Sequence, residues 1–387
     1  MRCRSFGEGL RRRDSGSMAG KTIAVLGAGH GGYAAAADLT KRGFDVRLHA
    51  RNEERLAPIH DRGGIEARGV HNELVPFDRT TTDVAEAVDG ADLIMLVVPS
   101  VAHEFYAKAL APLLTPEFPV FLNPGHTGGG LHFVNEVRRA GYDKEIRCCE
   151  SVTLTYICRM EGPATVGIYS YTKNLKFAAF PGKHLGELTD LVAPLYPEIR
   201  PASSVLETAL ANMNAVFHPP GMVLNTGWIQ RTDGGFLFYR EGITDGVGRV
   251  VSEVDAERLT IAEALSVPAA PFLETFFKAG LTTEAAAKSG SVARACEESE
   301  PNKTIKSPPS LDHRYMHEDI GYGLVPMSAL GRLVGVAAPA MEALVHLGSI
   351  AAGVDYAGHG LTLGKMGLDG IAAPDLPQFL EQGGATR

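Results

Sequence analysis

Two polar stretches in the second half of the chain contain residue types that can move a proton near neutral pH. The first holds Asn214 and His218, which are four residues apart and so share one helix face, before a Pro–Pro pair that is predicted to break the helix. The second, residues 311–320, holds Asp319. A carboxylate partner fixes the tautomer of a histidine and stabilises its charged form. We therefore predict that His218 and Asp319 form an acid–base dyad, with a structural histidine and a helix-capping aspartate as the alternatives.

A glycine-rich turn near the start of the chain predicts a dinucleotide-binding site. The run GAGHGG at residues 27–32 follows an apolar segment typical of a buried strand and precedes a helical pattern. Gly27 permits the tight turn, Gly29 lets a pyrophosphate approach the backbone, and Gly32 lets the helix pack on the strand. The free N–H groups of the helix N-terminus would bind the phosphates. The predicted binding residues in this turn are Gly27, Ala28, Gly29, Gly31 and Gly32.

The end of the second predicted strand favours NADP over NAD. An NAD-binding chain carries a carboxylate there, about 20 residues after the glycines, to accept hydrogen bonds from the adenosine ribose. In this chain Ala50 is followed by Arg51 and Asn52, with Arg55 one turn later. A guanidinium suits bidentate contact with a phosphate, so Arg51 and Asn52 are predicted to bind NADP. NAD stays open as the cofactor if Arg51 only covers surface and one of the two glutamates that follow Asn52 binds the ribose.

Apolar runs alternate with helical patterns between residues 21 and 122, as in a parallel sheet with helices on both faces. The predicted strands are Thr22–Leu26, Asp45–His49, Asp92–Val98 and Val120–Leu122, followed by Ser151–Tyr156, Thr165–Tyr169 and Leu175–Phe180. Ligands bind outside the carboxyl ends of such strands, so the loops after residues 98 and 122 are expected to flank a nicotinamide. Val98, Pro99 and Asn123 are the predicted contacts. His126, among many glycines, fits a loop-shaping role better than catalysis.

The strand pattern ends near residue 203, and long segments rich in Ala, Leu and Val follow. Helices are predicted at residues 204–214, 221–230, 247–265 and 329–352. The predicted fold class is α/β, with an N-terminal doubly wound Rossmann domain at residues 18–202 and an all-helical domain at residues 203–387. Residues 1–17 carry five arginines without a periodic apolar pattern, so they are expected to be a disordered leader.

Composition excludes several other classes of protein. The 387 residues carry 37 basic and 45 acidic side chains, a net charge of −8 that offers no general footprint for nucleic acid. The longest apolar run, Leu93 to Pro99, is too short for a bilayer, which needs about 20 residues. The five cysteines show no metal-binding spacing and no disulfide framework. We expect a cytoplasmic protein with reduced thiols and with no metal, membrane or nucleic acid as partner.

Eight motifs resemble the octopine/nopaline (opine) dehydrogenase family, with the bacterial N-(1-carboxyethyl)-norvaline group as the nearest. In order between about residues 21 and 368 they are VLGAGHGG, VVPS, LNPGHTGG, NMNAVFHP, YREGIT, VDAERL, RYMHEDIGYGLVP and LTLGKMGL. The resemblance implies a dinucleotide domain joined to a helical domain. It also implies an enzyme that condenses a 2-oxo acid with an amino acid and reduces the imine to a secondary-amine dicarboxylate.

The resemblance also implies roles for individual residues. It makes His218 the proton donor and acceptor, Asp319 its carboxylate partner, Asn214 a polar residue of the active site, and Arg314 an anchor for a substrate carboxylate. Where an NADH-using relative has an acid, this chain has Arg51, which supports NADP. The second carboxylate of the product needs another cation, and the sequence does not rank the candidates Arg159, Arg240 and Arg258.

Three questions stay open at this point. A 3-hydroxyacid or glycerol-phosphate-type dehydrogenase has a similar layout, but it usually carries a catalytic lysine on the first interdomain helix, and residues 204–217 contain none. A non-catalytic NADP(H)-binding sensor is disfavoured by the intact set of His218, Asp319 and Arg314. The apolar segment at residues 329–352 could bury against its own domain or form a homodimer.

Overall fold

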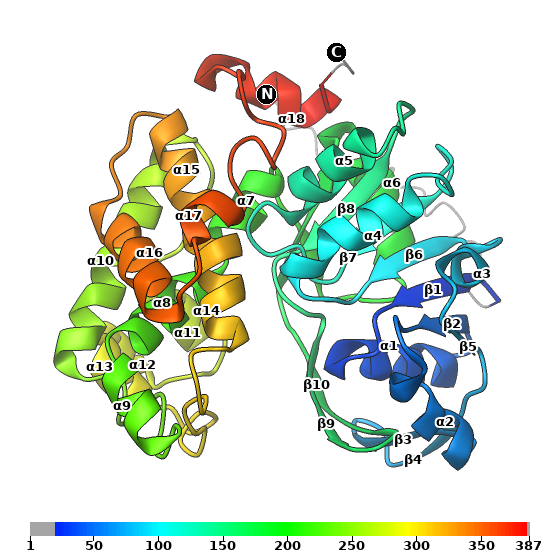
Figure 1. Cartoon of the computed structure of the whole chain (residues 1–387), viewed down its shortest axis with the longest axis horizontal. Helices are drawn as coiled ribbons and strands as arrows, with labels where there is room; N and C mark the ends of the chain where they lie inside the picture. Colours follow the sequence, from blue (N-terminus) through cyan, green and yellow to red (C-terminus); the bar gives the residue numbers. More distant parts are fainter. Residues whose placement is uncertain (1–19, 385–387) are drawn as a thin grey trace, which may run out of the picture.

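Continuous β-branched and aliphatic runs form the centre of an eight-stranded sheet (Figure 1). The computed structural model describes residues 20–384, and the expected leader at residues 1–17 lies outside them. The strand order is β12-β11-β8-β7-β6-β1-β2-β5, with all neighbours parallel except β8 and β11. The strands are β1 (Thr22–Leu26), β2 (Asp45–His49), β5 (Thr80–Thr81), β6 (Leu93–Leu96), β7 (Pro119–Leu122), β8 (Arg147–Ser151), β11 (Leu175–Phe180) and β12 (Ile199–Pro201). The order reverses beside β1, so a crevice opens at the carboxyl ends of β1 and β6.

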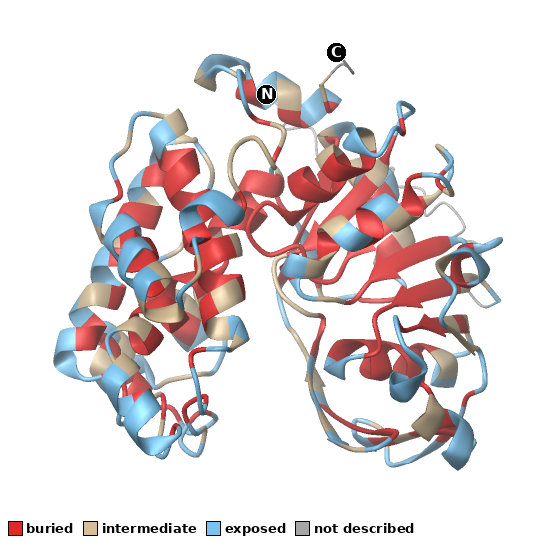
Figure 2. Cartoon of the chain, in the orientation of Figure 1, coloured by how far each residue is buried: buried red, intermediate tan, exposed pale blue. Residues whose placement is uncertain are grey.

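Two hydrophobic cores cover the two faces of this sheet. Successive residues of β1 alternate between them: Ala24 and Leu26 pack in one core, and Ile23 and Val25 in the other. The first core continues into the helical half of the chain, and Figure 2 shows buried residues along the sheet and on the inward faces of the helices. The helices of the first half of the chain, which carries the sheet, are α1 (His30–Lys41), α2 (Ala57–Arg62), α3 (Val84–Val88), α4 (His103–Leu110), α5 (Gly129–Arg139) and α6 (Leu185–Val192).

The predicted strands at 22–26, 45–49 and 175–180 are confirmed as β1, β2 and β11. The predicted strand Ser151–Tyr156 is wrong, because residues 152–155 connect β8 to the next strand. The reason lies in a side chain: the Oδ1 atom of Asn123 accepts the backbone N–H of Thr155 at 3.0 Å. This bond holds the segment against the loop after β7.

A second sheet of four strands, which the sequence did not predict as a unit, packs beside α1 (Figure 1). Its order is β4-β3-β10-β9, from β3 (Gly64–Gly69), β4 (Glu73–Pro76), β9 (Tyr156–Gly162) and β10 (Thr165–Tyr171). Along β9 the side chains alternate in exposure, and Ile157 and Arg159 lie on the exposed face. The opposite face of this sheet contacts α1, the helix that follows the glycine turn.

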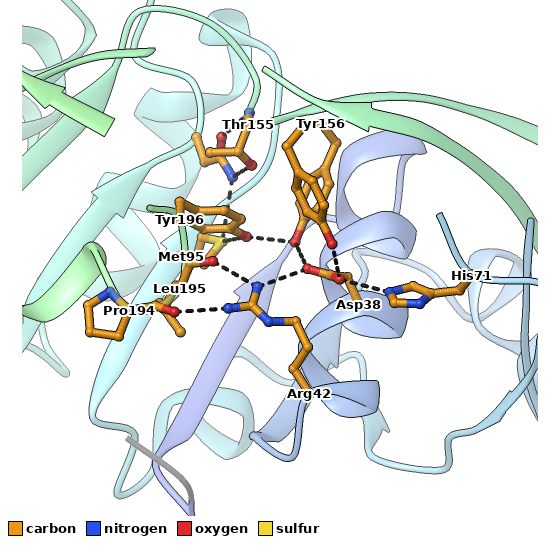
Figure 3. A network of polar contacts seen from close by, with 11 residues as sticks. Asp38, Arg42, His71, Met95, Thr155, Tyr156, Pro194, Leu195 and Tyr196 are labelled. Atoms are coloured by element: carbon orange, nitrogen blue, oxygen red, sulfur yellow. Dashed lines mark hydrogen bonds and ion pairs between the residues drawn. The ribbon is translucent and has the colours of Figure 1, made fainter. Parts of the chain in front are cut away.

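One buried carboxylate ties the second sheet to α1 (Figure 3). Asp38 of α1 is fully buried and accepts hydrogen bonds from the hydroxyls of Tyr156 (2.9 Å) and Tyr171 (2.7 Å), on β9 and β10. Its oxygens also contact Nε2 of His71 at 2.9 Å and the guanidinium of Arg42 at 3.2 Å. Asp38 is therefore the point at which two strands, a loop and a helix are joined.

Replacing Asp38 with alanine should lower the free energy of unfolding by about 3–5 kcal/mol, because several buried donors and a cation lose their common acceptor. Urea denaturation measures this loss. Tyr171→Phe is the matched control, since it removes a single hydrogen bond and should cost about 1 kcal/mol. Equal losses in the two variants would show that Asp38 does not act as a shared acceptor.

After β12 every regular element is a helix in the described part of the chain. These helices are α7 (Val205–Leu210), α8 (Met213–Val223), α9 (Thr226–Thr232), α10 (Asp245–Ala264), α11 (Phe272–Lys278), α12 (Glu284–Lys288), α13 (Val292–Glu297), α14 (Arg314–Asp319), α15 (Val325–Leu333), α16 (Pro339–Ala352), α17 (Tyr356–His359) and α18 (Leu376–Gln382). A π-helical turn, Ile320–Leu324, joins α14 to α15. The last segment returns to the first half, where Asn135 of α5 donates to the carbonyls of Gly364 and Lys365.

Two long predicted helices are each divided in the structure. The segment 204–214 breaks at Asn212, whose side chain accepts the N–H of Asn214 at 3.1 Å and caps α8. The segment 329–352 breaks between α15 and α16, where Gly335 has a φ of +75° and Pro339 begins the second helix.

The predicted helix break at Pro219 and Pro220 is also wrong, because both prolines lie inside α8. Residues 215–222 are all buried, and α8 packs against α10, α14 and α16. Tertiary packing therefore overrides the low helix propensity of proline. As a consequence, His218 lies in the middle of a buried helix and not at a helix end.

Candidate active site

The structure places His218 and Asp319 in direct contact. Nδ1 of His218, on α8, lies 2.8 Å from Oδ2 of Asp319, the last residue of α14. Both side chains are buried, with 4 % and 2 % of their residues' surface exposed. A carboxylate that accepts the Nδ1 proton leaves Nε2 as the nitrogen that can exchange a proton.

Two tyrosines that the sequence analysis missed enclose the His218 ring. Tyr315 stacks on it with ring centroids 3.6 Å apart, and the hydroxyl of Tyr239 lies 3.4 Å from Nε2. Burial raises the pKa of both phenols above its ordinary value, so both are neutral near pH 7. Tyr315 precedes Asp319 by four residues, a spacing that places both on one face of α14 and could have revealed it.

A cavity of about 460 Å³ lies between the two halves of the chain, beside the dyad. From the first half its lining includes Gly29, His30, Gly31, Val98, Pro99, Asn123 and His126, and from the helical half Asn214, His313, Arg314 and Glu318. Asn214 lies one helical turn before His218 on α8. Of the predicted site residues, Gly29, Gly31, Val98, Pro99, Asn123, Asn214 and Arg314 line this cavity, while the side chains of His218 and Asp319 are buried behind its lining.

The glycine turn has a geometry that only glycine permits at two of its positions. A Cβ at Gly32 would lie 1.6 Å from the carbonyl oxygen of Gly27, and Gly27 itself has a φ of +120°. At Gly29, by contrast, a Cβ would meet no atom within 4 Å, and the φ is −95°. Nothing in the protein requires a glycine at Gly29, so the open space above it fits the approach of a cofactor's pyrophosphate.

The N-terminus of α1 points into the same cavity. The helix begins at His30, and Gly29 provides no side chain to cap its first N–H groups. Burial, followed by the positive charges of Arg159, Arg314 and Arg55, lowers the pKa of His30. These groups together create a positive field, which fits an anionic ligand.

Arg51 and Asn52 follow β2 and are exposed at the end of the crevice. The guanidinium of Arg51 lies 5.7 Å from the ring centroid of Phe105, an exposed side chain on α4. The residue at the end of the strand is Ala50, which is buried and has no carboxylate to offer a ribose. An exposed guanidinium of this kind can make bidentate contact with a phosphate.

The two loops after β6 and β7 both line the cavity, and the side-chain amide of Asn123 bonds within the protein. Its amide donates to Oγ1 of Thr155 at 2.9 Å and accepts the N–H of the same residue. Asn123 thus shapes the loop that lines the cavity, while a cofactor contact by this residue stays a prediction. Val98 and Pro99 line the cavity together with Asn123.

The structure ranks the three arginines that the sequence left unranked. Arg258 is fully buried and bonds to Asp255 and to the carbonyls of Leu210 and Ala270, which is a structural role. Arg240 is exposed, and its charge adds to that of Lys303 in lowering the pKa of Glu300. Of these three arginines, only Arg159, on the exposed face of β9, carries a charge that helps burial to lower the pKa of His30 at the cavity.

Two findings on the described residues concern membranes and metal ions. Between residues 20 and 384, no helix is long and apolar enough to cross a membrane. In the same part of the chain, no group of three or more His, Cys, Asp or Glu side chains is arranged to hold a metal ion.

Comparison with known proteins gives matches over both halves of the chain. The family model "NAD/NADP octopine/nopaline dehydrogenase, alpha-helical domain" matches residues 201–352. The model "NAD-dependent glycerol-3-phosphate dehydrogenase N-terminus" matches residues 22–145. An opine dehydrogenase of Arthrobacter sp. (strain 1C) is 35% identical over 369 residues, which cover 93% of this chain and 99% of the relative.

Solved structures share the complete fold. Octopine dehydrogenase in complex with NADH and agmatine matches with a TM-score of 0.73 and 20% identity, covering 95% of this chain and 99% of that one. Yersinopine dehydrogenase with NADP+ bound matches with a TM-score of 0.70 and 16% identity, covering 94% and 98%. The predicted fold class, a Rossmann domain followed by a helical domain, is confirmed.

Proposed function

Because the chain belongs to the octopine/nopaline (opine) dehydrogenase family, we propose that it reduces the imine of a 2-oxo acid and an amino acid with NADPH. Membership makes it an oxidoreductase that uses a nicotinamide cofactor and acts on CH–NH bonds. The observation that carries the proposal is the buried His218–Asp319 pair, whose neighbours Asn214 and Glu318 line the same cavity as the glycine turn. Assignment to the N-(1-carboxyethyl)-norvaline group stays a prediction.

The proposed reaction joins an amine to a carbonyl with loss of water and then adds a hydride and a proton across the C=N bond. When bound, the cofactor supplies the hydride. Protonated His218 supplies the proton from Nε2 to the nitrogen of the substrate, and in the reverse direction it accepts that proton. Asp319 holds Nδ1 and stabilises the charged ring, as a carboxylate does in other histidine-based sites.

Two carboxylates of the product need cationic partners, and one arginine from each half of the chain is close enough to affect His30 at the cavity. Arg314 lines the cavity on α14, next to the Tyr315 ring that covers His218. Arg159 approaches from β9, and the charges of both arginines act on His30. We assign Arg314 and Arg159 as the anchors of the two carboxylates, with guanidinium forks suited to that geometry.

The experiment that tests the proposal is NADPH oxidation against a matrix of 2-oxo acids and amino acids, with controls that lack the amine. We expect oxidation that requires both substrates and a secondary-amine dicarboxylate as product. Oxidation without amine would instead identify a hydroxyacid dehydrogenase. Cofactor binding without turnover across the matrix would identify a sensor.

Cofactor choice gives a separate prediction at Arg51. We expect kcat/KM to be higher with NADPH than with NADH, and Arg51→Gln to lower the NADPH value by about 10–100-fold, since hydrogen bonds to charged groups contribute about 1.5–3 kcal/mol. The NADH value should change little. Glu53→Gln is the matched variant for the alternative: if it lowers NADH use while Arg51→Gln leaves NADPH use unchanged, the cofactor is NAD.

A further inference from the structure

Two neighbouring carboxylates at the end of α14 point to different halves of the chain. Asp319 contacts His218 within the helical half. Glu318 reaches the other half, where its Oε1 atom accepts the backbone N–H of Ser100 at 2.9 Å and lies 3.6 Å from Nε2 of His126. Ser100 follows β6 and His126 follows β7, so Glu318 contacts both loops that line the cavity.

These contacts are buried, as are the bonds of Asn212 to Thr127 and of Thr208 to Glu150 between the same two halves. Glu318, Ser100 and His126 are 5 %, 2 % and 6 % exposed. Removing a carboxylate from water is costly, and an apolar residue at such a place is often as stable or more stable. A contribution to stability therefore gives a weak reason for a glutamate here, whereas a fixed distance between the halves gives a strong one.

α14 carries both Glu318 and Asp319. Contacts that do not involve Glu318 hold this helix against α8 and His218. α14 packs against α8, and the π-helical turn that follows it approaches α8 closely, since a Cβ at Gly323 would lie 2.6 Å from Cβ of Ala215. Tyr315 adds its stack on the His218 ring. Loss of Glu318 should therefore leave the His218–Asp319 pair intact and release only its connection to the loops of the first half.

We propose that Glu318 is a positioning residue that sets the distance between the dyad and the two loops after β6 and β7 by accepting the Ser100 N–H bond and lying against His126. The proposal rests on the proposed function, because the dyad is the acid–base pair of that reaction. Both contacts of Glu318 described above are to the loops, so we place its effect in the position of His218 relative to the substrate carbon. Reactions of this kind are sensitive to such placement: a misplacement of about 1 Å can cost about 10²-fold in rate.

The test compares Glu318→Ala with Glu318→Gln. The amide of glutamine can still accept the Ser100 N–H, so Glu318→Gln should keep kcat within about fivefold, while Glu318→Ala should lose about 10²-fold. The dissociation constant of NADPH should stay within about threefold in both variants. Asp312→Asn is the matched control, because Asp312 lies just before α14 and bonds only to the exposed side of His317 among the described residues.

A second measurement tests the contact between Glu318 and the loop after β6 without requiring catalysis. Amide hydrogen exchange should rise at residues 98–103 in Glu318→Ala, stay near the wild-type rate in Glu318→Gln, and remain unchanged in α8. An unchanged kcat in Glu318→Ala, or a kcat loss that comes with a tenfold weaker NADPH affinity, would overturn the proposal. So would an equal loss in the alanine and glutamine variants. If the wild-type protein reduces no imine, the proposed function fails, while the exchange result still reports whether Glu318 joins the loops.

Discussion

Replacing His218 with alanine should lower kcat for imine reduction by about 10²–10⁴-fold, the range expected when general acid–base catalysis is lost. The reason is geometric. Asp319 occupies Nδ1 at 2.8 Å, so Nε2 is the nitrogen left to pass a proton, and the neighbouring phenols have raised pKa values that keep their protons in place. Steady-state kinetics with the best substrate pair measures this loss, and the NADPH dissociation constant should not change.

Two further variants make the His218 result specific. Asp319→Asn should also lower kcat, because an amide cannot stabilise the charged ring and can favour the wrong tautomer. His317→Asn is the control, since this histidine lies on α14 but bonds to Asp312 and Tyr356. Wild-type turnover in His218→Ala, with its melting temperature preserved, would remove His218 from the mechanism. A loss of equal size in His317→Asn would indicate damage to α14 instead.

Local patterns were sufficient for the central sheet but not for the second sheet. Strands such as Thr22–Leu26 are short, continuous and apolar, so a local pattern is enough to reveal them, although β1 pairs with the distant β6 as well as with β2. The strands β3 and β4 contain glycine and charged residues, and β3 pairs with β10, far along the chain. Their stability comes from that distant pairing and from α1, neither of which a local window contains.

The same distinction applies to the candidate site. Residue types and a family resemblance were sufficient to pair His218 with Asp319, and spacing alone could have added Tyr315. Glu318 carried no such signal, because its partners Ser100 and His126 depend on how the two halves pack together. The prolines of α8 and the burial of Arg258 were likewise decided by tertiary contacts, which turned a predicted helix end into a helix centre and a substrate candidate into a structural residue.

Alanine substitutions at two glycines of the turn between β1 and α1 should have different effects, one on folding and the other on cofactor binding. In Gly32→Ala the new Cβ would lie 1.6 Å from the backbone oxygen of Gly27, and neither atom belongs to a flexible side chain. The turn between β1 and α1 must therefore move. We expect a loss of more than about 4 kcal/mol in the free energy of unfolding, the range reserved for severe backbone or core damage. Denaturant unfolding of the free protein measures it.

Gly29→Ala is the matched counterpart, because a Cβ there meets nothing in the protein and the backbone is not in the left-handed region. Stability should stay within about 1 kcal/mol, since the weaker cap and the reduced freedom of the unfolded chain offset each other. The NADPH dissociation constant, in contrast, should rise by roughly 10–100-fold, because the methyl group occupies the space through which a pyrophosphate reaches the helix N-terminus. Wild-type affinity in Gly29→Ala would place the pyrophosphate elsewhere, and wild-type stability in Gly32→Ala would contradict the close contact between the two glycines.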